Sequence, residues 1–204
     1  HIRGGMEKGK KWYENGKKKN KLNSFKDFIT CAEFLKKENI SKNITIHGGS
    51  AGGLLIGASL NISPDTFHCA VAEVPFVDVL NTILDDTLPL TPPEWEEWGN
   101  PIKNKSDFDY IGSYSPYDNI KEQNYPTILA TSGLTDPRVT YWEATKWIAK
   151  LRSKKTNDNP LFLKTYTEAG HGGMAGRYNQ IKETAFIYAF ILWRNNLIKR
   201  PFTR

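Results

Sequence analysis

The chain alternates between two hydrophobic patterns, one typical of strands and one typical of helices. Short apolar runs of strand length, bounded by glycine, proline or polar residues, cover residues 44–47, 69–74, 127–132 and 161–166. Apolar positions that recur every three or four residues predict helices over residues 24–38, 51–60, 141–151 and 178–194. This alternation of helix and strand predicts an α/β fold, with a mainly parallel sheet and helices on its faces.

Local signals refine the ends and faces of these elements. Ser24 is expected to cap the first helix, with Asp27 as the acidic residue three positions later. Residues 1–23 are basic, contain few apolar positions and are expected to form a loop. The last helix is expected to carry its apolar face on Ile181, Ala185, Tyr188, Ala189 and Leu192.

Residues 85–119 interrupt the regular pattern, because prolines punctuate this segment throughout. We expect loops and short helices there, and long irregular segments in compact domains are often functional. No stretch of the chain resembles a linker, so residues 1–204 are expected to form one domain.

Composition and charge exclude several classes of protein. Hydrophobic residues make up 39% of the chain and aromatic residues 12%, which indicates a packed core. No apolar run approaches 18 residues, so we expect no membrane span. The net charge is +6, but the lysines gather mainly in residues 8–21 without an RNA-binding motif, which indicates a solvated surface and no nucleic-acid partner. Cys31 and Cys69 are expected to be buried free thiols in a reducing, cytoplasmic compartment, and no signal peptide is recognisable.

The sharpest chemical signal is the glycine-rich turn at residues 48–53, directly after a predicted strand and before a predicted helix. It contains G-x-S-x-G as Gly48, Ser50 and Gly52, the pattern of a nucleophile on a strained strand–turn–helix connection. The N–H of Ala51 then points toward an oxyanion that forms beside Ser50. A phosphate-binding loop is excluded because the lysine of that motif is missing, and a dinucleotide fingerprint fits poorly.

A serine of this kind needs a base and a carboxylate that follow it in the order Ser, Asp, His. His171 follows the predicted strand at residues 161–166, and Asp136 follows the one at residues 127–132. Both therefore emerge at the carboxyl edge of the sheet, where sites in α/β proteins form. Asp136 could instead be a helix cap and His171 an ordinary loop histidine, but three such placements in the required order favour a Ser50–His171–Asp136 triad. We expect neither a metal nor a cofactor.

Several segments together resemble the prolyl oligopeptidase family of serine peptidases, with the closest likeness to its oligopeptidase B subgroup. The resemblance rests on residues 1–5, 11–13 and 23–28, the turn at 48–53, and residues 74–79, 94–101, 141–143 and 170–173. It implies an α/β-hydrolase fold and cleavage of short peptides after Arg or Lys. By motif match it implies that Glu94 and Glu96 bind the P1 side chain of the substrate and that Arg138 contacts the substrate backbone. Glu97 is expected to have a structural role.

The chain also departs from the family pattern. The family's N-terminal β-propeller and the first strands of its sheet precede the region that matches, so the resemblance implies an N-terminally truncated domain without the second oxyanion donor. A separately encoded propeller half is therefore a possible partner, besides short basic peptides. Two alternatives stay open: an inactive or complementation-dependent fragment, and an esterase or acyl-aminoacyl peptidase of the same fold.

Overall fold

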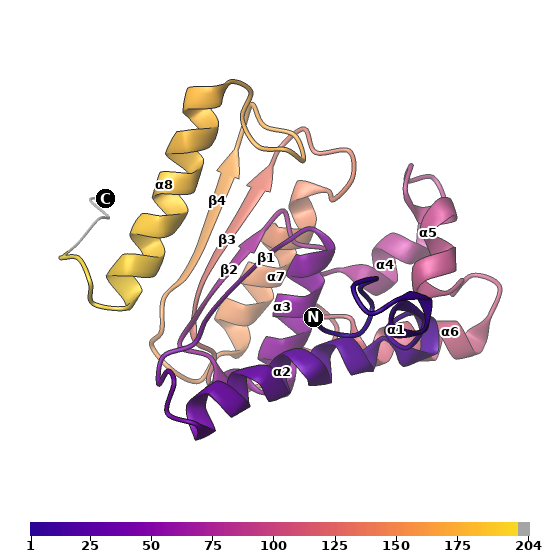
Figure 1. The fold of residues 1–204 in the computed structure, drawn as a ribbon. Helices are drawn as coiled ribbons and strands as arrows, with labels where there is room; N and C mark the ends of the chain where they lie inside the picture. The colour runs from indigo at the N-terminus through magenta and orange to yellow at the C-terminus, as the bar shows by residue number, and fades with distance from the viewer. Residues whose placement is uncertain (200–204) are drawn as a thin grey trace.

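The computed structural model describes residues 1–199, in which four parallel strands form one sheet in the order β1-β2-β3-β4. The strands are β1 (Thr45–Gly49), β2 (Cys69–Glu73), β3 (Thr127–Gly133) and β4 (Leu161–Tyr166). The register pairs Ile46 with Ala70, Ala70 with Ile128, and Ile128 with Leu161. Because every pair is parallel, the carboxyl ends of all four strands lie at the same edge of the sheet (Figure 1).

The helices follow the predicted order. Those next to the sheet are α2 (Leu22–Lys37), α3 (Ala51–Ile62), α7 (Tyr141–Lys154) and α8 (Arg177–Arg194). The others are α1 (Lys10–Glu14), α4 (Val79–Leu84), α5 (Thr91–Trp98) and α6 (Lys105–Tyr114), with 3-10 turns at η1 (Lys18–Asn20) and η2 (Pro64–Thr66). The predicted α/β fold is confirmed. None of the helices in residues 1–199 is both long and apolar enough to cross a bilayer.

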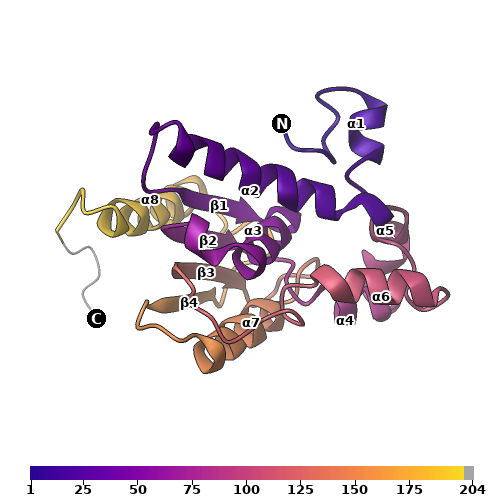
Figure 2. The ribbon, with the colours of Figure 1, turned by 90° about the horizontal axis from the view of Figure 1, so that it is seen from below.

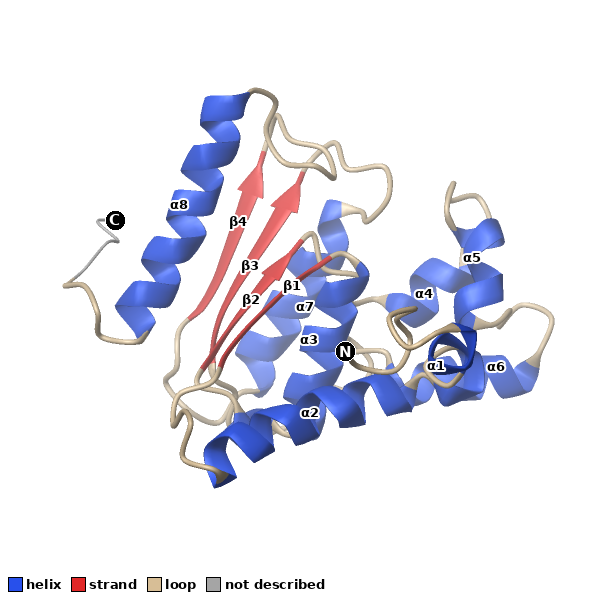
Figure 3. Cartoon of the chain, viewed as in Figure 1, coloured by secondary structure: helices blue, strands red, loops and turns tan. Residues whose placement is uncertain are grey.

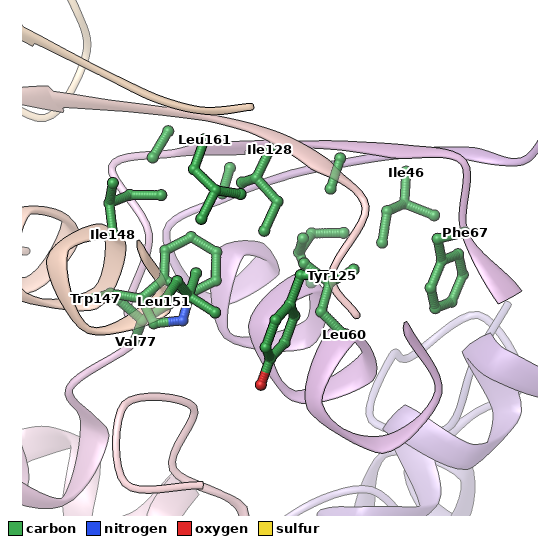
Figure 4. Close-up of a cluster of buried hydrophobic side chains, with 14 of the residues drawn as sticks. Ile46, Leu60, Phe67, Val77, Tyr125, Ile128, Trp147, Ile148, Leu151 and Leu161 are labelled. Carbon is green, nitrogen blue, oxygen red and sulfur yellow. The ribbon is translucent and has the colours of Figure 1, made fainter. Parts of the chain in front are cut away.

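The sheet separates two layers of helices, with α3 and α7 on one face and α8 on the other (Figures 1 and 3). Successive side chains of a strand point to opposite faces. Ala70 and Ile128 therefore pack on the α3 and α7 side, in a cluster that includes Trp147 and Leu151. Figure 4 shows Ile128 with these two side chains. The other face is covered by α8, where Val71, Leu129, Ile187 and Phe190 form a second cluster.

The proline-rich segment forms α5, α6 and connecting loops, which lie with α4 beside the sheet (Figure 2). This is the mixture of loops and short helices that the sequence predicts. These helices have an apolar core of their own, in which Phe76 packs against Trp98 with ring centroids 5.5 Å apart. Leu54 of α3 belongs to the same core, so this layer is attached directly to the helix that follows Ser50.

The prediction for the N-terminal region is wrong in two respects. Residues 1–23 are not a continuous loop, since they contain α1 and η1. Ser24 does not cap α2, because the helix begins at Leu22, whose N–H donates to the Tyr110 hydroxyl (3.2 Å). Ser24 instead donates to the carbonyl of Arg3 (2.6 Å), and Asp27 forms a salt bridge with the Arg3 side chain. Both residues therefore anchor the N-terminal segment rather than start a helix.

Two predictions of burial are also wrong. On α8, the expected apolar face is exposed: Ile181 is 54% and Tyr188 61% accessible, whereas Ile187 and Phe190 pack against the sheet. The helix is apolar on more than one side, so periodicity alone could not select the side that meets the sheet. Cys31 is exposed on α2 and only Cys69 is buried.

Candidate active site

Ser50 lies on the tight turn between β1 and α3. Its backbone has φ 54° and ψ −121°, a conformation that costs about 1–3 kcal/mol for a residue with a side chain. The turn is held from both sides, because the N–H of Ser50 donates to the carbonyl of Glu73 (2.9 Å) and its carbonyl accepts from the N–H of Phe76 (3.0 Å). The strained conformation is the one expected of a nucleophile elbow.

The glycines around Ser50 are required to different degrees. A Cβ atom on Gly48 would lie 2.5 Å from the carbonyl oxygen of Gly52, and one on Gly53 would lie 2.4 Å from Cβ of Pro75. A Cβ atom on Gly52 would meet nothing within 4 Å. Close backbone packing therefore demands Gly48 and Gly53, whereas the last glycine of the G-x-S-x-G pattern faces open space.

Ala51 is the first residue of α3, so its N–H has no acceptor within the helix. The N-terminus of a helix also carries a partial positive charge, which favours an anion placed there. Ala51 lines the same cavity as Ser50. Its amide is thus suited to receive negative charge that develops next to Ser50.

Asp136 and His171 are in contact at the carboxyl ends of β3 and β4. Nδ1 of His171 lies 2.8 Å from Oδ2 of Asp136, and the Asp136 side chain is fully buried. The other carboxylate oxygen accepts the N–H groups of Arg138 (2.8 Å) and Val139 (3.0 Å). Because a carboxylate only accepts, this contact puts the proton on Nδ1 and leaves Nε2 of His171 as an acceptor.

The loops that carry these two residues are tied together by backbone contacts. The N–H and the hydroxyl of Thr135 both donate to the carbonyl of Ala169, at 3.1 and 3.0 Å. A Cβ atom on Gly133 would lie 2.5 Å from the same carbonyl oxygen. The approach of the Asp136 loop to the His171 loop therefore depends on a glycine at the end of β3.

Ser50 and His171 line different cavities, and no hydrogen bond joins their side chains within residues 1–199. The His171 cavity, about 250 Å³, also contains Glu73, Tyr166 and Glu183. Burial raises the pKa of the Tyr166 hydroxyl to about 12, with a smaller contribution from the two nearby glutamates. The structure thus brings together two of the three predicted triad residues and puts the third on an adjoining turn of the same sheet edge.

The Ser50 cavity contains the predicted substrate residues Glu94 and Arg138. Its walls are otherwise largely apolar and are formed by Phe76, Thr82, Ile83, Leu88, Leu90, Thr91, Trp98 and Val139. Glu94 accepts a hydrogen bond from Nε1 of Trp98 (2.8 Å) and forms no salt bridge with any residue that the structure describes. A carboxylate without a cationic partner in an apolar cavity is suited to bind a cation.

The two other glutamates of α5 lie outside this cavity. Glu96 is 86% exposed and pairs with Lys18 at 3.0 Å, and the hydrogen bond from Lys18 lowers the pKa of the Glu96 carboxyl. Glu97 accepts from the Tyr13 hydroxyl (2.7 Å) and from Lys21 (3.1 Å), which joins α5 to the N-terminal segment. Of the two glutamates assigned to the P1 side chain, the structure therefore brings only Glu94 to Ser50.

Sequence reasoning assigned no role to Glu143, which is completely buried on α7. Its position could have drawn attention, because it lies four residues before the buried Trp147 and hence on the core-facing side of the helix.

No cluster of three potential metal-ligating side chains occurs in residues 1–199.

Comparison with known proteins agrees with the fold and the motifs. The prolyl oligopeptidase family pattern matches residues 1–196. Protease 2 of Moraxella lacunata is 50% identical over 193 residues, and dipeptidyl aminopeptidase BI of Pseudoxanthomonas mexicana is 47% identical over 194 residues. Each alignment covers 94% of this chain, but the chain spans only 28% and 27% of the lengths of these two relatives.

Solved structures show the same relationship. Oligopeptidase B from Leishmania major superimposes over the whole chain with a TM-score of 0.94 and 48% identity. Oligopeptidase B from Trypanosoma brucei, solved with covalently bound antipain, superimposes with a TM-score of 0.93 and 49% identity. In both cases this chain corresponds to 29% of the solved chain. The chain therefore belongs to the prolyl oligopeptidase family of peptidases.

Proposed function

We propose that this chain carries the catalytic machinery of a serine peptidase that cleaves short peptides after Arg or Lys. The observation that carries the proposal is the contact between Asp136 and His171 at the sheet edge from which Ser50 also emerges. The order Ser, Asp, His along the chain is that of α/β hydrolases. The covalent complex of the Trypanosoma brucei relative with antipain supports a covalent mechanism for this site.

In this mechanism, Oγ of Ser50 attacks the scissile carbonyl while Nε2 of His171 takes the hydroxyl proton. The carbonyl oxygen becomes an oxyanion beside the Ala51 N–H, and such a donor contributes about 3–4 kcal/mol to transition-state stabilisation. The intermediate collapses, and the amine leaves with the proton from His171. Water then hydrolyses the acyl-enzyme by the same steps. Asp136 fixes the tautomer of His171 and stabilises its protonated form. Nε2 approaches Oγ when substrate occupies the site, as catalytic hydrogen bonds often tighten on binding.

The charge of the Ser50 cavity supports the proposed substrate class. Glu94 is a carboxylate without a cationic partner between apolar walls, which suits the long apolar stem and cationic end of Arg or Lys. Arg138 lines the same cavity and can donate to the carbonyl oxygens of the substrate backbone. Glu96 pairs with Lys18 on the surface, so the proposal assigns P1 recognition to Glu94.

A pair of ester substrates tests this proposal. The purified chain should hydrolyse an Arg ester faster than a neutral acyl ester with the same leaving group, and Ser50→Ala should abolish both activities. Equal turnover of the two esters would favour the esterase alternative. Turnover that survives Ser50→Ala in a clean preparation would reject the serine mechanism.

A second candidate is a catalytic half that depends on another polypeptide, such as a separately encoded propeller half. The exposed apolar side chains of α8, among them Ile181 and Tyr188, favour it, because monomeric domains rarely expose contiguous apolar surface. Labelling by a fluorophosphonate can be compared for the chain alone and for the chain mixed with the N-terminal part of the Moraxella lacunata relative. Labelling that appears only in the mixture would support complementation.

A further inference from the structure

Glu143 on α7 is a completely buried carboxylate that contacts Thr82, a residue of the Ser50 cavity wall. It is 0% exposed, and its two oxygens accept three hydrogen bonds from one neighbouring segment. Oε2 accepts the N–H groups of Val77 (2.9 Å) and Asp78 (2.8 Å), and Oε1 accepts the hydroxyl of Thr82 (2.7 Å). A buried carboxylate is expensive unless it is fully hydrogen-bonded, so this arrangement fixes residues 77–82 firmly to α7.

The segment held by Glu143 forms part of the cavity wall. Thr82 and Ile83 of α4 both line the cavity that contains Ser50. Their backbone carbonyls accept hydrogen bonds from α5: the carbonyl of Thr82 from the Thr91 hydroxyl (2.7 Å), and that of Ile83 from Nε1 of Trp95 (3.2 Å). Trp95 directly follows Glu94 in α5. The contacts therefore run from Glu143 through α4 to the helix that carries the cavity's carboxylate.

A second tie connects the same two elements. Lys146, one turn after Glu143 on α7, forms a salt bridge with the buried side chain of Asp78. Asp78 also accepts from the side-chain amide of Asn81 (2.7 Å), which stabilises the first turn of α4. On α7, Glu143 is therefore an acceptor and Lys146 a donor for neighbouring residues at the start of α4. Together the two contacts fix the position of α4.

We propose that Glu143 is a positioning residue for the cation-binding cavity: through residues 77–82 and α5 it holds Glu94 in the wall of the cavity that contains Ser50. The inference rests on the proposed function. It assigns Glu143 no contact with substrate, and it separates binding in the cavity from the reactivity of Ser50. Removal of the three hydrogen bonds should weaken cation binding and leave attack by Ser50 largely intact.

The chain offers variants that separate these effects. Glu143→Leu keeps most of the side-chain volume and removes all three acceptor contacts. Glu143→Gln keeps a hydrogen bond to each of the three groups but reverses one of them, since its carbonyl oxygen can accept both backbone N–H groups and its amide can donate to the Thr82 hydroxyl. Thr82→Val preserves the shape of the side chain but removes one tie, which provides a milder variant if Glu143→Leu does not fold. Glu122→Gln is a matched control, because Glu122 is 71% exposed and pairs with Lys154 at the surface.

The test measures binding of benzamidine, a small cation, by calorimetry, and the rate of labelling by a small fluorophosphonate. Glu143→Leu should weaken benzamidine binding about tenfold or more, because α4 and the α5 wall that carries Glu94 lose their three hydrogen bonds to α7. Thr82→Val should weaken it by a smaller factor, and Glu143→Gln and Glu122→Gln should bind like the parent chain. Labelling rates of the Glu143 and Glu122 variants should stay within about threefold of the parent rate, a spread of roughly 0.6 kcal/mol.

Unchanged benzamidine binding in folded Glu143→Leu, or in Thr82→Val if the leucine variant does not fold, would overturn the positioning role. So would a Glu143→Gln variant that binds as weakly as Glu143→Leu, because hydrogen bonding would then not be the cause. If the parent chain itself does not bind benzamidine, the cation-binding cavity of the proposed function is rejected, which is a different result from either of these.

Discussion

Nδ1 of His171 lies 2.8 Å from the buried carboxylate of Asp136, across 35 residues of sequence. The contact forms because β3 and β4 are neighbouring parallel strands, so the loops after them emerge side by side. One oxygen of Asp136 is occupied by its own turn, which leaves the other aimed at the imidazole. The pair is thus set before any substrate arrives.

Replacing Asp136 by asparagine should remove most of the activity. An amide in this place can donate to Nδ1 and so favours the tautomer in which Nε2 carries the proton, the wrong state for a base. The corresponding change in chymotrypsin-like enzymes lowers kcat roughly 10,000-fold, and a loss of similar order is expected here. Steady-state hydrolysis of the Arg ester measures it. A loss below about tenfold would show that the contact does not orient a catalytic base.

The two α5 carboxylates should respond differently to neutralisation. Glu94→Gln should raise KM for an Arg ester more than for a neutral ester, because only Glu94 lines the Ser50 cavity. Glu96→Gln is the matched control and should change neither, since Glu96 pairs with Lys18 at the surface. If Glu96→Gln affected the Arg ester as much as Glu94→Gln does, both residues would contact the P1 side chain, as the motif match implies.

The glycines of the Ser50 turn should differ in their tolerance of alanine. Gly53→Ala puts a Cβ atom 2.4 Å from Cβ of Pro75, and such overpacking costs about 1–3 kcal/mol. Gly52→Ala meets nothing within 4 Å and should stabilise the chain by about 0.4–1 kcal/mol through the unfolded state. Urea denaturation of both variants measures the difference. Equal destabilisation by the two substitutions would contradict the described turn.

Glu143 should make the stability of the chain fall as pH rises. Burial raises the pKa of its carboxyl from 4.5 to about 7, opposed by hydrogen bonds from Asp78, Thr82 and Val77 and supported by the charge of Asp78. Between these two pKa values the folded chain holds a proton that the unfolded chain has lost. The contribution is therefore complete below about pH 4.5 and is lost as pH rises through about 7.

The variant Glu143→Gln removes this dependence. Relative to Glu143→Gln, the parent chain should lose up to about 3 kcal/mol of unfolding free energy between pH 4 and pH 8. Urea denaturation across this range, at constant ionic strength, provides the measurement. Parallel stability curves for the two proteins would show that Glu143 does not titrate in this window.

The sequence predicts the sheet and part of the site because these depend on local pattern and chain order. Short apolar runs bounded by glycine, proline or polar residues locate the four strands, and the glycines around Ser50 mark its turn. Since parallel strands end at one edge, the positions of Asp136 and His171 just after two strands are enough to bring their loops to the same edge.

The remaining features depend on tertiary contacts that a local pattern does not contain. Glu96 is drawn to the surface by Lys18, which lies 78 residues earlier in a 3-10 turn. The start of α2 depends on the hydroxyl of Tyr110, 88 residues away. Because α8 is apolar on several sides, only its contact with the sheet determines which side is buried. The role of Glu143 becomes visible only from its hydrogen bonds with Val77, Asp78 and Thr82.

We propose that Ser50 is a nucleophile activated by His171. Mass spectrometry after reaction with a fluorophosphonate, in the parent chain and in His171→Ala, tests this activation. A single adduct on Ser50 is expected in the parent chain, and none in His171→Ala over the same time. An adduct on another residue, or labelling of Ser50 that persists at the parent rate without His171, would contradict it.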